Sequence, residues 1–191
     1  MNKWFFNLTL TLLIPTSVFC QEKFERESRI STSDLPKFVL DFESTFEDHQ
    51  SIKWYLEEGL ERYSIEAKYK REGKRFSVEF DTLGILEDVE IEIEQTAIPK
   101  TTFDSICERL KADGKSYKID KIQIQFTGDQ SVLEKVAKSG ESEKGCVIRY
   151  ELVVRMRKGK NLSSFEYLFS ENGVLEKRSE IIIQTSSNLE Y

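Results

Sequence analysis

Few side chains in this sequence have the types and spacing that catalysis or metal binding requires. His49 is the only histidine, and it lies in the acidic segment Glu47-Asp48-His49-Gln50, where a solvated corner residue is expected. The sequence has no Cys-x-x-Cys or His-Glu-x-x-His motif, no Gly-x-Ser-x-Gly motif and no glycine-rich phosphate loop. Because an enzyme needs a nucleophile, a base or a metal held in one place, we predict a protein that is not an enzyme and that uses no metal or cofactor.

A row of carboxylates occupies alternate positions between residues 88 and 94, so a strand there would carry them on one face, roughly 7 Å apart. Carboxylates spaced in this way could share a calcium ion or face a basic partner. The more common arrangement is a solvated face whose charge is balanced across the sheet, and the sequence offers Lys68, Lys70 and Arg75 for that role. We therefore expect a solvated face here.

The first 20 residues have the pattern of a secretory signal peptide. Lys3 gives a positive start, an uncharged apolar run extends from Trp4 to Val18, and polar residues follow at once. The run is shorter than the roughly 20 apolar residues that cross a membrane, and no later segment reaches this length. We expect cleavage after Cys20 and a periplasmic or secreted protein. A lipid anchor at Cys20 is the alternative, although Phe19 is larger than the residue that a lipobox places before its cysteine.

Two cysteines, Cys107 and Cys146, remain after such a cleavage. Cys107 shares the apolar stripe of a predicted helix, and Cys146 starts a predicted strand whose alternate positions are apolar, so both are expected to face the same core. An oxidising compartment then favours a Cys107–Cys146 disulfide. The alternative is two buried thiols that act as small apolar side chains.

The composition indicates one folded domain. Aromatic residues make up 12% of the chain, including 13 phenylalanines, which is more apolar surface than a disordered chain carries. The net charge of −6 argues against a nucleic-acid partner, because binding to phosphates needs a basic footprint. Removal of residues 1–20 leaves 171 of the 191 residues, the usual size of a single domain.

The remaining chain shows the same order of elements twice. Each half opens with an apolar residue and a proline, at Leu35-Pro36 and Ile98-Pro99, which suits the first turn of a helix. Apolar residues then recur with helical spacing, and afterwards they alternate with charged residues, as in antiparallel strands with one buried face. The closing turns also align, residues 80–87 with residues 169–176, and each has a glycine where a positive φ is expected. We therefore predict an α+β fold built from two helix-plus-strands units.

The second unit contains an insertion. Residues 127–145 have no counterpart in the first unit, are polar and lie between glycines, so we expect a mobile loop with one or two helical turns near residues 132–138. The predicted boundaries are a polar, frayed tail at 21–33, a single domain at 34–183 with repeats at 34–94 and 97–183, and a second tail at 184–191.

Four features of the sequence occur together: Leu-Pro before an aromatic helix, Lys53-Trp54 at the first strand, a Tyr-led strand, and Phe-Asp-x-x-Gly-Ile-Leu at the closing turn. This combination is similar to the PepSY-like, β-lactamase-inhibitor-like family of exported bacterial domains. The resemblance covers roughly residues 30–183. It implies two tandem helix-plus-three/four-strand repeats that form one curved antiparallel sheet, with both helices on one face. It also implies an open sheet face able to receive a partner. Arg178 and Glu180 depart from the pattern, and they leave the register of the last strand open.

Candidate contact residues are those that point away from the predicted core. Val153 and Leu168 interrupt the alternation of their strands, and a four-residue turn would place them directly opposite each other. Tyr55 also falls on the non-core side of its strand. Arg155 and Arg157 belong to a basic turn that could contact anionic lipid or glycan, with a solvated hairpin tip as the alternative. Apolar side chains that form a contiguous exposed patch mark a contact site, whereas scattered ones are incidental.

These observations predict an exported binding module that uses the open face of its sheet to contact a protein partner in the cell envelope, in a way that resembles an inhibitor. The alternative is a cell-envelope domain that binds a small ligand or an ion. A ligand pocket should contain buried polar residues, and the sequence pattern does not reveal them.

Overall fold

The structure is a computed structural model that describes residues 21–23, 25–44, 46, 51–59, 62–114, 116–158 and 160–182. The predicted signal peptide with Cys20, the histidine His49 and the predicted tail at 184–191 lie outside these residues. None of the helices in the described ranges combines the length and the apolar character needed to span a membrane.

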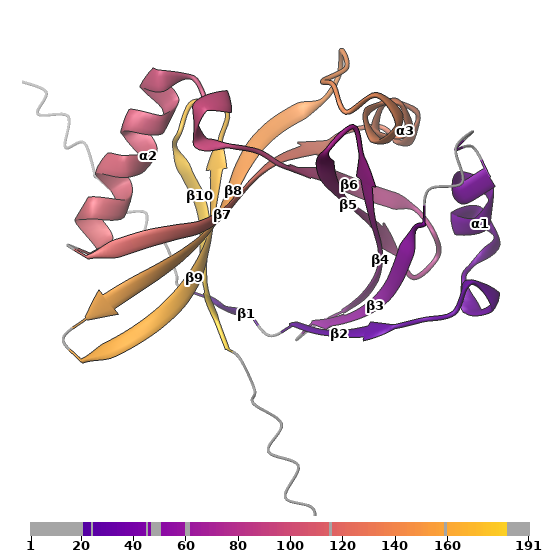
Figure 1. The fold of residues 1–191 in the computed structure, drawn as a ribbon, viewed down its shortest axis with the longest axis horizontal. Coiled ribbons are helices and arrows are strands. Elements are labelled where there is room, and N and C mark those ends of the chain that lie inside the picture. The colour runs from indigo at the N-terminus through magenta and orange to yellow at the C-terminus, as the bar shows by residue number, and fades with distance from the viewer. Residues whose placement is uncertain are drawn as a thin grey trace, which may run out of the picture.

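Ten strands of the described chain form one sheet, in the order β1-β10-β9-β8-β7-β6-β5-β4-β3-β2 (Figure 1). Strands β2 to β10 are antiparallel to their neighbours, and β1 runs parallel to β10. The strands are β1 (Gln21–Lys23), β2 (Glu25–Arg29), β3 (Lys53–Gly59), β4 (Tyr63–Arg71), β5 (Lys74–Asp81), β6 (Leu86–Glu92), β7 (Tyr117–Thr127), β8 (Val147–Lys158), β9 (Asn161–Ser170) and β10 (Leu175–Ile181). The predicted α+β class is confirmed, and the predicted antiparallel sheet is confirmed for β2 to β10, with β1 as a parallel edge strand.

Three α-helices lie on the outer, convex side of the curved sheet (Figure 1). They are α1 (Lys37–Ser44), α2 (Lys100–Asp113) and α3 (Gln130–Ser139), and the short 3-10 helices η1 (Thr32–Asp34) and η2 (Gln95–Ala97) precede α1 and α2. In both places a proline follows the 3-10 turn, because its fixed φ and missing N–H suit the start of a helix. The predicted helix starts are therefore confirmed.

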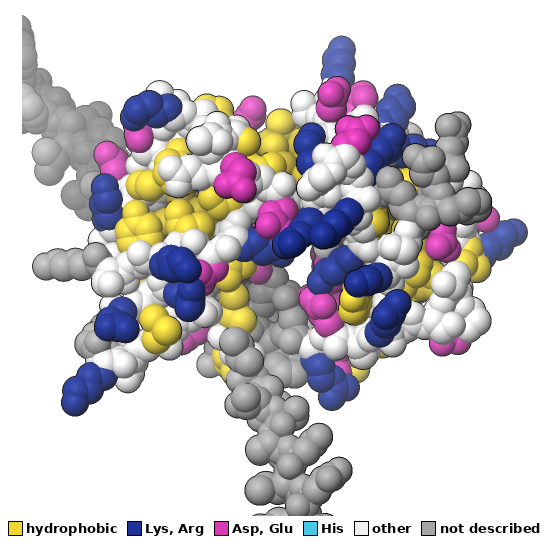
Figure 2. All heavy atoms as spheres, in the orientation of Figure 1, with side chains coloured by type: hydrophobic (Ala, Val, Ile, Leu, Met, Phe, Trp, Pro, Cys, Tyr) yellow, Lys and Arg dark blue, Asp and Glu magenta, His cyan; other side chains and the backbone are white. Residues whose placement is uncertain are grey.

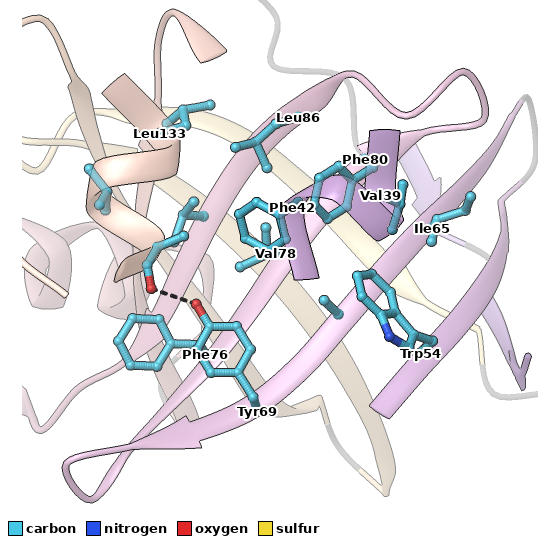
Figure 3. Packing of buried hydrophobic residues seen from close by; sticks show 14 of the residues in the cluster. Val39, Phe42, Trp54, Ile65, Tyr69, Phe76, Val78, Phe80, Leu86 and Leu133 are labelled. Atoms are coloured by element: carbon cyan, nitrogen blue, oxygen red, sulfur yellow. Dashed lines mark hydrogen bonds between the residues drawn. The ribbon is translucent and has the colours of Figure 1, made fainter. Parts of the chain in front are cut away.

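The core consists of two hydrophobic clusters between the helices and the sheet. The first cluster joins α1 and α3 to β3–β6, and Figure 3 shows its aromatic centre, where Phe42 and Phe80 meet edge to face at 5.1 Å. The second cluster joins α2 to β7–β10 around the fully buried Tyr167 and Phe169. The inward positions of each strand supply these residues, as the alternating sequence pattern requires.

The segment 127–145 differs from the mobile loop that the sequence predicts. It contains α3, whose Leu133, Val136 and Ala137 are completely buried in the first cluster. The Tyr69 hydroxyl donates a hydrogen bond of 2.7 Å to the carbonyl oxygen of Ala137, which ties the helix to β4 (Figure 3). The helical turns expected near residues 132–138 are confirmed as part of α3. The mobile character expected for the segment was wrong for this helix, because apolar residues at i, i+3 and i+4 are enough to dock a short amphipathic helix.

The predicted N-terminal tail at 21–33 also takes part in the fold. Its first residues form β1 beside β10, and the next form β2 beside β3, at the opposite edge of the sheet. Lys23 and Glu25 are two residues apart, a distance of at most about 7 Å along the chain, so the two edges of the sheet must approach each other at this point. The expectation of a frayed tail was wrong for this segment, which pairs through its backbone although its side chains are polar.

The two closing turns share one backbone geometry. Gly84 has φ of 87° and donates its N–H to the Asp81 carbonyl at 3.0 Å, and Gly173 has φ of 78° and donates to the Ser170 carbonyl at 2.9 Å. The positive φ predicted at both glycines is confirmed. The duplication of the whole unit stays a prediction from the sequence.

Strand β10 has a register shift between Leu175 and Lys177. After it, Arg178 faces the helices: its guanidinium group lies 4.1 Å from the ring centre of Phe165 and 3.8 Å from a carboxylate oxygen of Asp113 on α2. A charged residue can occupy this position because the aromatic face and the carboxylate replace the water that it loses.

The predicted disulfide is not formed: Cys107 and Cys146 are free, and both are half-buried. Cys107 on α2 is hydrogen-bonded to Tyr117 beside the second cluster, and burial and this bond together raise the pKa of Tyr117. Cys146 packs instead against the first cluster. Cys146 therefore belongs to the first cluster, whereas the helix of Cys107 packs in the second, and the prediction treated the two clusters as one core.

Candidate binding face

The concave face is the side of the sheet opposite the helices. Its side chains are the alternate residues of the strands and are mostly charged or polar, in contrast to the apolar face under the helices. Like charges gather in separate rows across this face, and the strand register decides which side chains meet.

A basic hollow of about 760 Å³ opens at one end of the concave face. In the space-filling view, Lys and Arg side chains gather over the space that the curved sheet encloses (Figure 2). The side chains that give the hollow its character are Lys53, Tyr55, Lys68, Lys70, Arg75 and Lys121, from strands β3, β4, β5 and β7.

The register of the strands places cations of the hollow side by side. Lys53 lies directly opposite Lys68, and Lys70 lies directly opposite Arg75. Like charges at directly opposite positions destabilise strand pairing. The arrangement therefore costs stability, and strand formation alone gives no reason for it.

Only part of this charge is balanced by acidic side chains. Lys68 contacts Glu27 at 2.7 Å and Glu66 at 2.9 Å, and Arg75 contacts Glu92 at 3.3 Å. Burial lowers the pKa of Lys68, but the hydrogen bonds to Glu27 and Glu66 and their charges outweigh it, so the net shift is upward and the ammonium group stays protonated.

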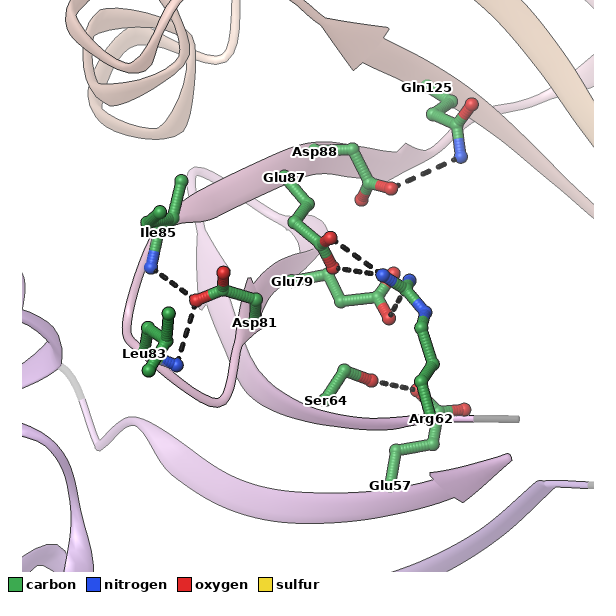
Figure 4. A network of polar contacts seen from close by, with 10 residues as sticks. All are labelled: Glu57, Arg62, Ser64, Glu79, Asp81, Leu83, Ile85, Glu87, Asp88 and Gln125. Atoms are coloured by element: carbon green, nitrogen blue, oxygen red, sulfur yellow. Dashed lines mark hydrogen bonds and ion pairs between the residues drawn. The ribbon is translucent and has the colours of Figure 1, made fainter. Parts of the chain in front are cut away.

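An acidic row lies across the same face beside the hollow. Glu66, Glu79 and Asp88 are directly opposite one another on β4, β5 and β6. Figure 4 shows how Arg62 offsets this row: its guanidinium group contacts Glu87 at 2.6 Å and Glu79 at 3.2 Å.

Asp88 remains in an unfavourable environment for a charge. Burial raises its pKa well above the ordinary value of 3.8, and the charges of Glu79, Glu151 and Glu87 raise it further, against a smaller opposite effect of Arg62. The side-chain amide of Gln125 donates to the Asp88 carboxylate at 3.4 Å (Figure 4). The folded protein therefore favours the neutral form of this carboxyl.

Replacing Asp88 with asparagine should stabilise the protein at neutral pH. Since the folded-state pKa of Asp88 is raised, the native protein binds this proton more tightly than the unfolded chain, and stability falls as the pH rises through the raised pKa. The amide that replaces the carboxyl carries no charge, so we expect Asp88→Asn to raise the melting temperature by about 2–4 °C at neutral pH and to leave it unchanged near pH ~4. Thermal unfolding at both pH values measures this.

The matched control is Glu92→Gln, which removes the same charge from a carboxylate that is paired with Arg75. We expect no gain in melting temperature from it. An equal gain in both variants would show that overall net charge, and not the environment of Asp88, causes the effect.

The acidic positions between residues 88 and 94 do not form a single ion site. Glu92 pairs with Arg75, whereas Asp88 and Glu90 both accept from the Gln125 amide, at 3.4 Å and 3.1 Å. Within the part of the chain that the structure describes, no group of three or more potential ligands could hold a metal ion.

The structure places the predicted contact residues on the concave face, in two groups. Tyr55 lines the basic hollow, where the Lys68 ammonium lies 5.1 Å from its ring centre. Val153 and Leu168 are half-buried on β8 and β9, farther along the sheet. The expected direct pairing of Val153 with Leu168 was wrong, because Val153 is opposite Glu166 and Leu168 is opposite Glu151. Lys158 pairs with Asn161, so the turn is shorter than the four residues predicted. The two apolar side chains are therefore diagonal neighbours on β8 and β9.

The two arginines differ in their surroundings. Arg155 is held by Asp120, with a contact of 2.7 Å from Nη2 and a second, shorter one from Nε, and these hydrogen bonds lower the pKa of the Asp120 carboxyl. Arg157 is exposed. Arg155 therefore presents an ion pair rather than a single charge to a partner.

Sequence reasoning missed Lys53 and Lys121 as candidate site residues. Both are exposed, and both line the hollow. They are far apart in sequence, and only the strand order brings both of them to the hollow. An excess of lysine on the non-core side of several strands is the only signal that could have indicated them.

Solved structures share this fold at low sequence identity. Two of them are DUF2874 family proteins, from Bacteroides ovatus and Bacteroides uniformis, and each has a TM-score of 0.51 and 12% sequence identity to this chain. The alignment covers 76% of this chain in both cases, with 87% of the Bacteroides ovatus protein and 88% of the Bacteroides uniformis protein. A BLIP-like protein from Bacteroides fragilis has a TM-score of 0.47 and 18% identity, with 76% of this chain and 86% of that chain covered. No protein-family model and no curated protein matches the sequence.

These likenesses bear on the fold alone. The two DUF2874 family proteins share the architecture of this chain, and the PepSY-like and β-lactamase-inhibitor-like names stay predictions from the sequence. What the chain binds has to be argued from its own concave face.

Proposed function

We propose that this chain is an exported binding module, active in the periplasm or outside the cell, and that its concave face contacts a protein partner. The observation that carries the proposal is the asymmetry of the sheet: three helices cover its convex face, and no helix of the described chain covers the concave face. That face also holds all five candidate contact residues and the basic hollow. The export half of the proposal depends on the signal-peptide pattern of residues 1–20.

The electrostatics of the face support a contact role over a purely structural one. Opposite-charge pairs between strands stabilise a sheet, yet here cations face cations and carboxylates face carboxylates. Separate rows of charge suit recognition, because complementary potentials select a partner and speed its association. A catalytic role for the same face is not proposed.

The test is capture of a partner from envelope extract by two matched pairs of variants. Val153→Gln with Leu168→Gln changes the half-buried apolar pair of the concave face. Phe38→Gln with Leu83→Gln changes two apolar side chains at the α1 end of the molecule, which are 66% and 72% exposed. We expect the first pair to reduce capture about tenfold and the second to leave it unchanged, because energetic contacts concentrate at a few buried residues.

Glutamine is used at the concave positions because Glu151 and Glu166 lie opposite them, where a new carboxylate would add repulsion. Loss of capture by the Phe38/Leu83 variant alone would contradict the proposal and move the contact to the outer surface.

A further inference from the structure

The charge of the basic hollow is opposite in sign to that of the whole protein. The chain carries a net charge of −6, yet the residues lining the hollow include five cations and only two carboxylates, Glu92 and Asp120. Both carboxylates are engaged by arginines, Glu92 by Arg75 and Asp120 by Arg155. The hollow therefore concentrates positive potential in a concave space, where the surrounding protein focuses the field.

Three ammonium groups at the hollow are available to a ligand. Lys53, Lys70 and Lys121 are exposed, and none has an acidic side chain within ion-pair distance in the described part of the chain. Two of them also face another cation directly, Lys53 against Lys68 and Lys70 against Arg75. An anionic group placed between the strands would relieve both repulsions, so ligand binding would recover the stability that the free sheet lacks.

The spread of these cations favours several anionic groups over one compact anion. They belong to β3, β4, β5 and β7, and neighbouring strands are about 4.8 Å apart. Four of the five cations are lysines, which act as point charges on flexible stems and not as the rigid fork with which arginine grips one phosphate or carboxylate. Carboxylates that follow one another along a peptide match such a row of separate charges.

The shape of the site argues against a membrane surface. The lysines line a hollow, and Figure 2 shows Lys and Arg side chains gathered over the space that the curved sheet encloses. A bilayer presents its charge as a broad and nearly flat layer. Tyr55 and the buried Gln123 also line the hollow, and they offer an aromatic ring and an amide to the backbone and side chains of a peptide.

We propose that the basic hollow receives an acidic segment of the partner protein, with Lys53, Lys70 and Lys121 binding its carboxylates and Tyr55 packing against the chain between them. This inference rests on the proposed function, of which it names the partner chemistry. It predicts a preference for peptides with several Asp or Glu residues in succession.

The test uses the exported chain and a fluorescently labelled hexaglutamate peptide at low ionic strength, with hexaglutamine as the neutral peptide. The hollow variant is Lys53→Gln with Lys70→Gln and Lys121→Gln. The matched control removes three exposed lysines from the helices on the convex side: Lys37→Gln, Lys111→Gln and Lys135→Gln. Fluorescence anisotropy gives the affinity of each protein.

We expect hexaglutamate to bind the unmodified protein and hexaglutamine not to bind. Affinity should fall at least about tenfold in the hollow variant and less than about twofold in the control, because three local contacts are lost in one case and only long-range charge in the other. The melting temperature of the hollow variant should be unchanged or higher, since two like-charge pairs are removed. Lys70→Gln alone, which changes one exposed side chain, keeps the test available if the triple variant folds poorly.

An equal loss in both triple variants, or no binding of hexaglutamate to the unmodified protein, would overturn the inference. So would binding of only inorganic pyrophosphate, or only of phosphatidylglycerol vesicles, each of which is measured in parallel. If the hollow variant binds hexaglutamate as tightly as the unmodified protein, the inference about the hollow is wrong. The proposed function would still stand if the Val153/Leu168 variant loses partner capture.

Discussion

Replacing Leu133 with alanine should reduce the free energy of unfolding by about 2–5 kcal/mol. Leu133 is 0% exposed and packs in the first cluster, so the truncated side chain would leave a cavity between α3 and the sheet. Urea-induced unfolding followed by circular dichroism gives the loss directly. This is one of the two largest effects that we expect from a single substitution.

The control for Leu133→Ala is Lys135→Ala, an exposed position on the same helix, for which we expect a change within about 0.5 kcal/mol. If both variants unfold like the unmodified protein, α3 does not dock on the sheet, and residues 127–145 form the mobile loop that the sequence suggested. The size of the difference therefore measures how much of the first cluster depends on this inserted helix.

The second large effect is expected from Gly173→Ala. Gly173 has φ of 78°, and a Cβ atom built there would lie 2.7 Å from the carbonyl oxygen of Thr102 on α2 and 3.1 Å from the Cβ atom of Ser105. Strain of about 1–2 kcal/mol from the left-handed backbone adds to the cost of pushing α2 away from the turn, so we expect a total loss of about 2–5 kcal/mol.

Gly73→Ala separates the two contributions. Gly73 has φ of 80°, and a Cβ atom there would meet nothing within 4 Å. We expect its unfolding free energy to fall by about 1–2 kcal/mol, from backbone strain alone. If the two alanine variants lose the same free energy of unfolding, the turn after β9 does not pack closely against α2. That result would contradict the close approach of Gly173 to Thr102.

The sequence predicts the strands and the first and second helices well, because each leaves a local signature. Alternating apolar residues mark β4, β5 and β6, and the Leu35-Pro36 and Ile98-Pro99 pairs mark the entry to α1 and α2. It predicts β1 and β2 poorly. These strands are polar, and their pairing depends on backbone hydrogen bonds at the two edges of the sheet, which no side-chain pattern reveals.

The candidate site is predictable only in part, for a related reason. Tyr55, Val153 and Leu168 can be assigned to the non-core face from the alternation of their own strands. The hollow cannot be assigned in this way, since Lys53 and Lys121 are 121 − 53 = 68 residues apart in sequence. The strand order and the curvature of the sheet bring them to one space, and both are properties of the whole fold.

The pairing of the cysteines shows the same limit. Cys146 packs on the helix side of the sheet, and Cys107 lies on α2, one of the helices on that side. Periodicity says which face a residue occupies but not how far along that face it lies. The two hydrophobic clusters therefore look like one core from the sequence, and the free thiols belong to different ends of it.

Site-specific photo-crosslinking tests the central claim, that the concave face is the contact surface, most directly. A photoreactive residue is placed at Tyr55 or Val153 on the concave face, or at Lys111 or Lys135 on the convex helices, and crosslinked products from envelope extract are compared by mass spectrometry. We predict one protein crosslinked from both concave positions and absent from both convex ones. Crosslinks to that protein from Lys111 and Lys135, with none from Tyr55 and Val153, would contradict the claim.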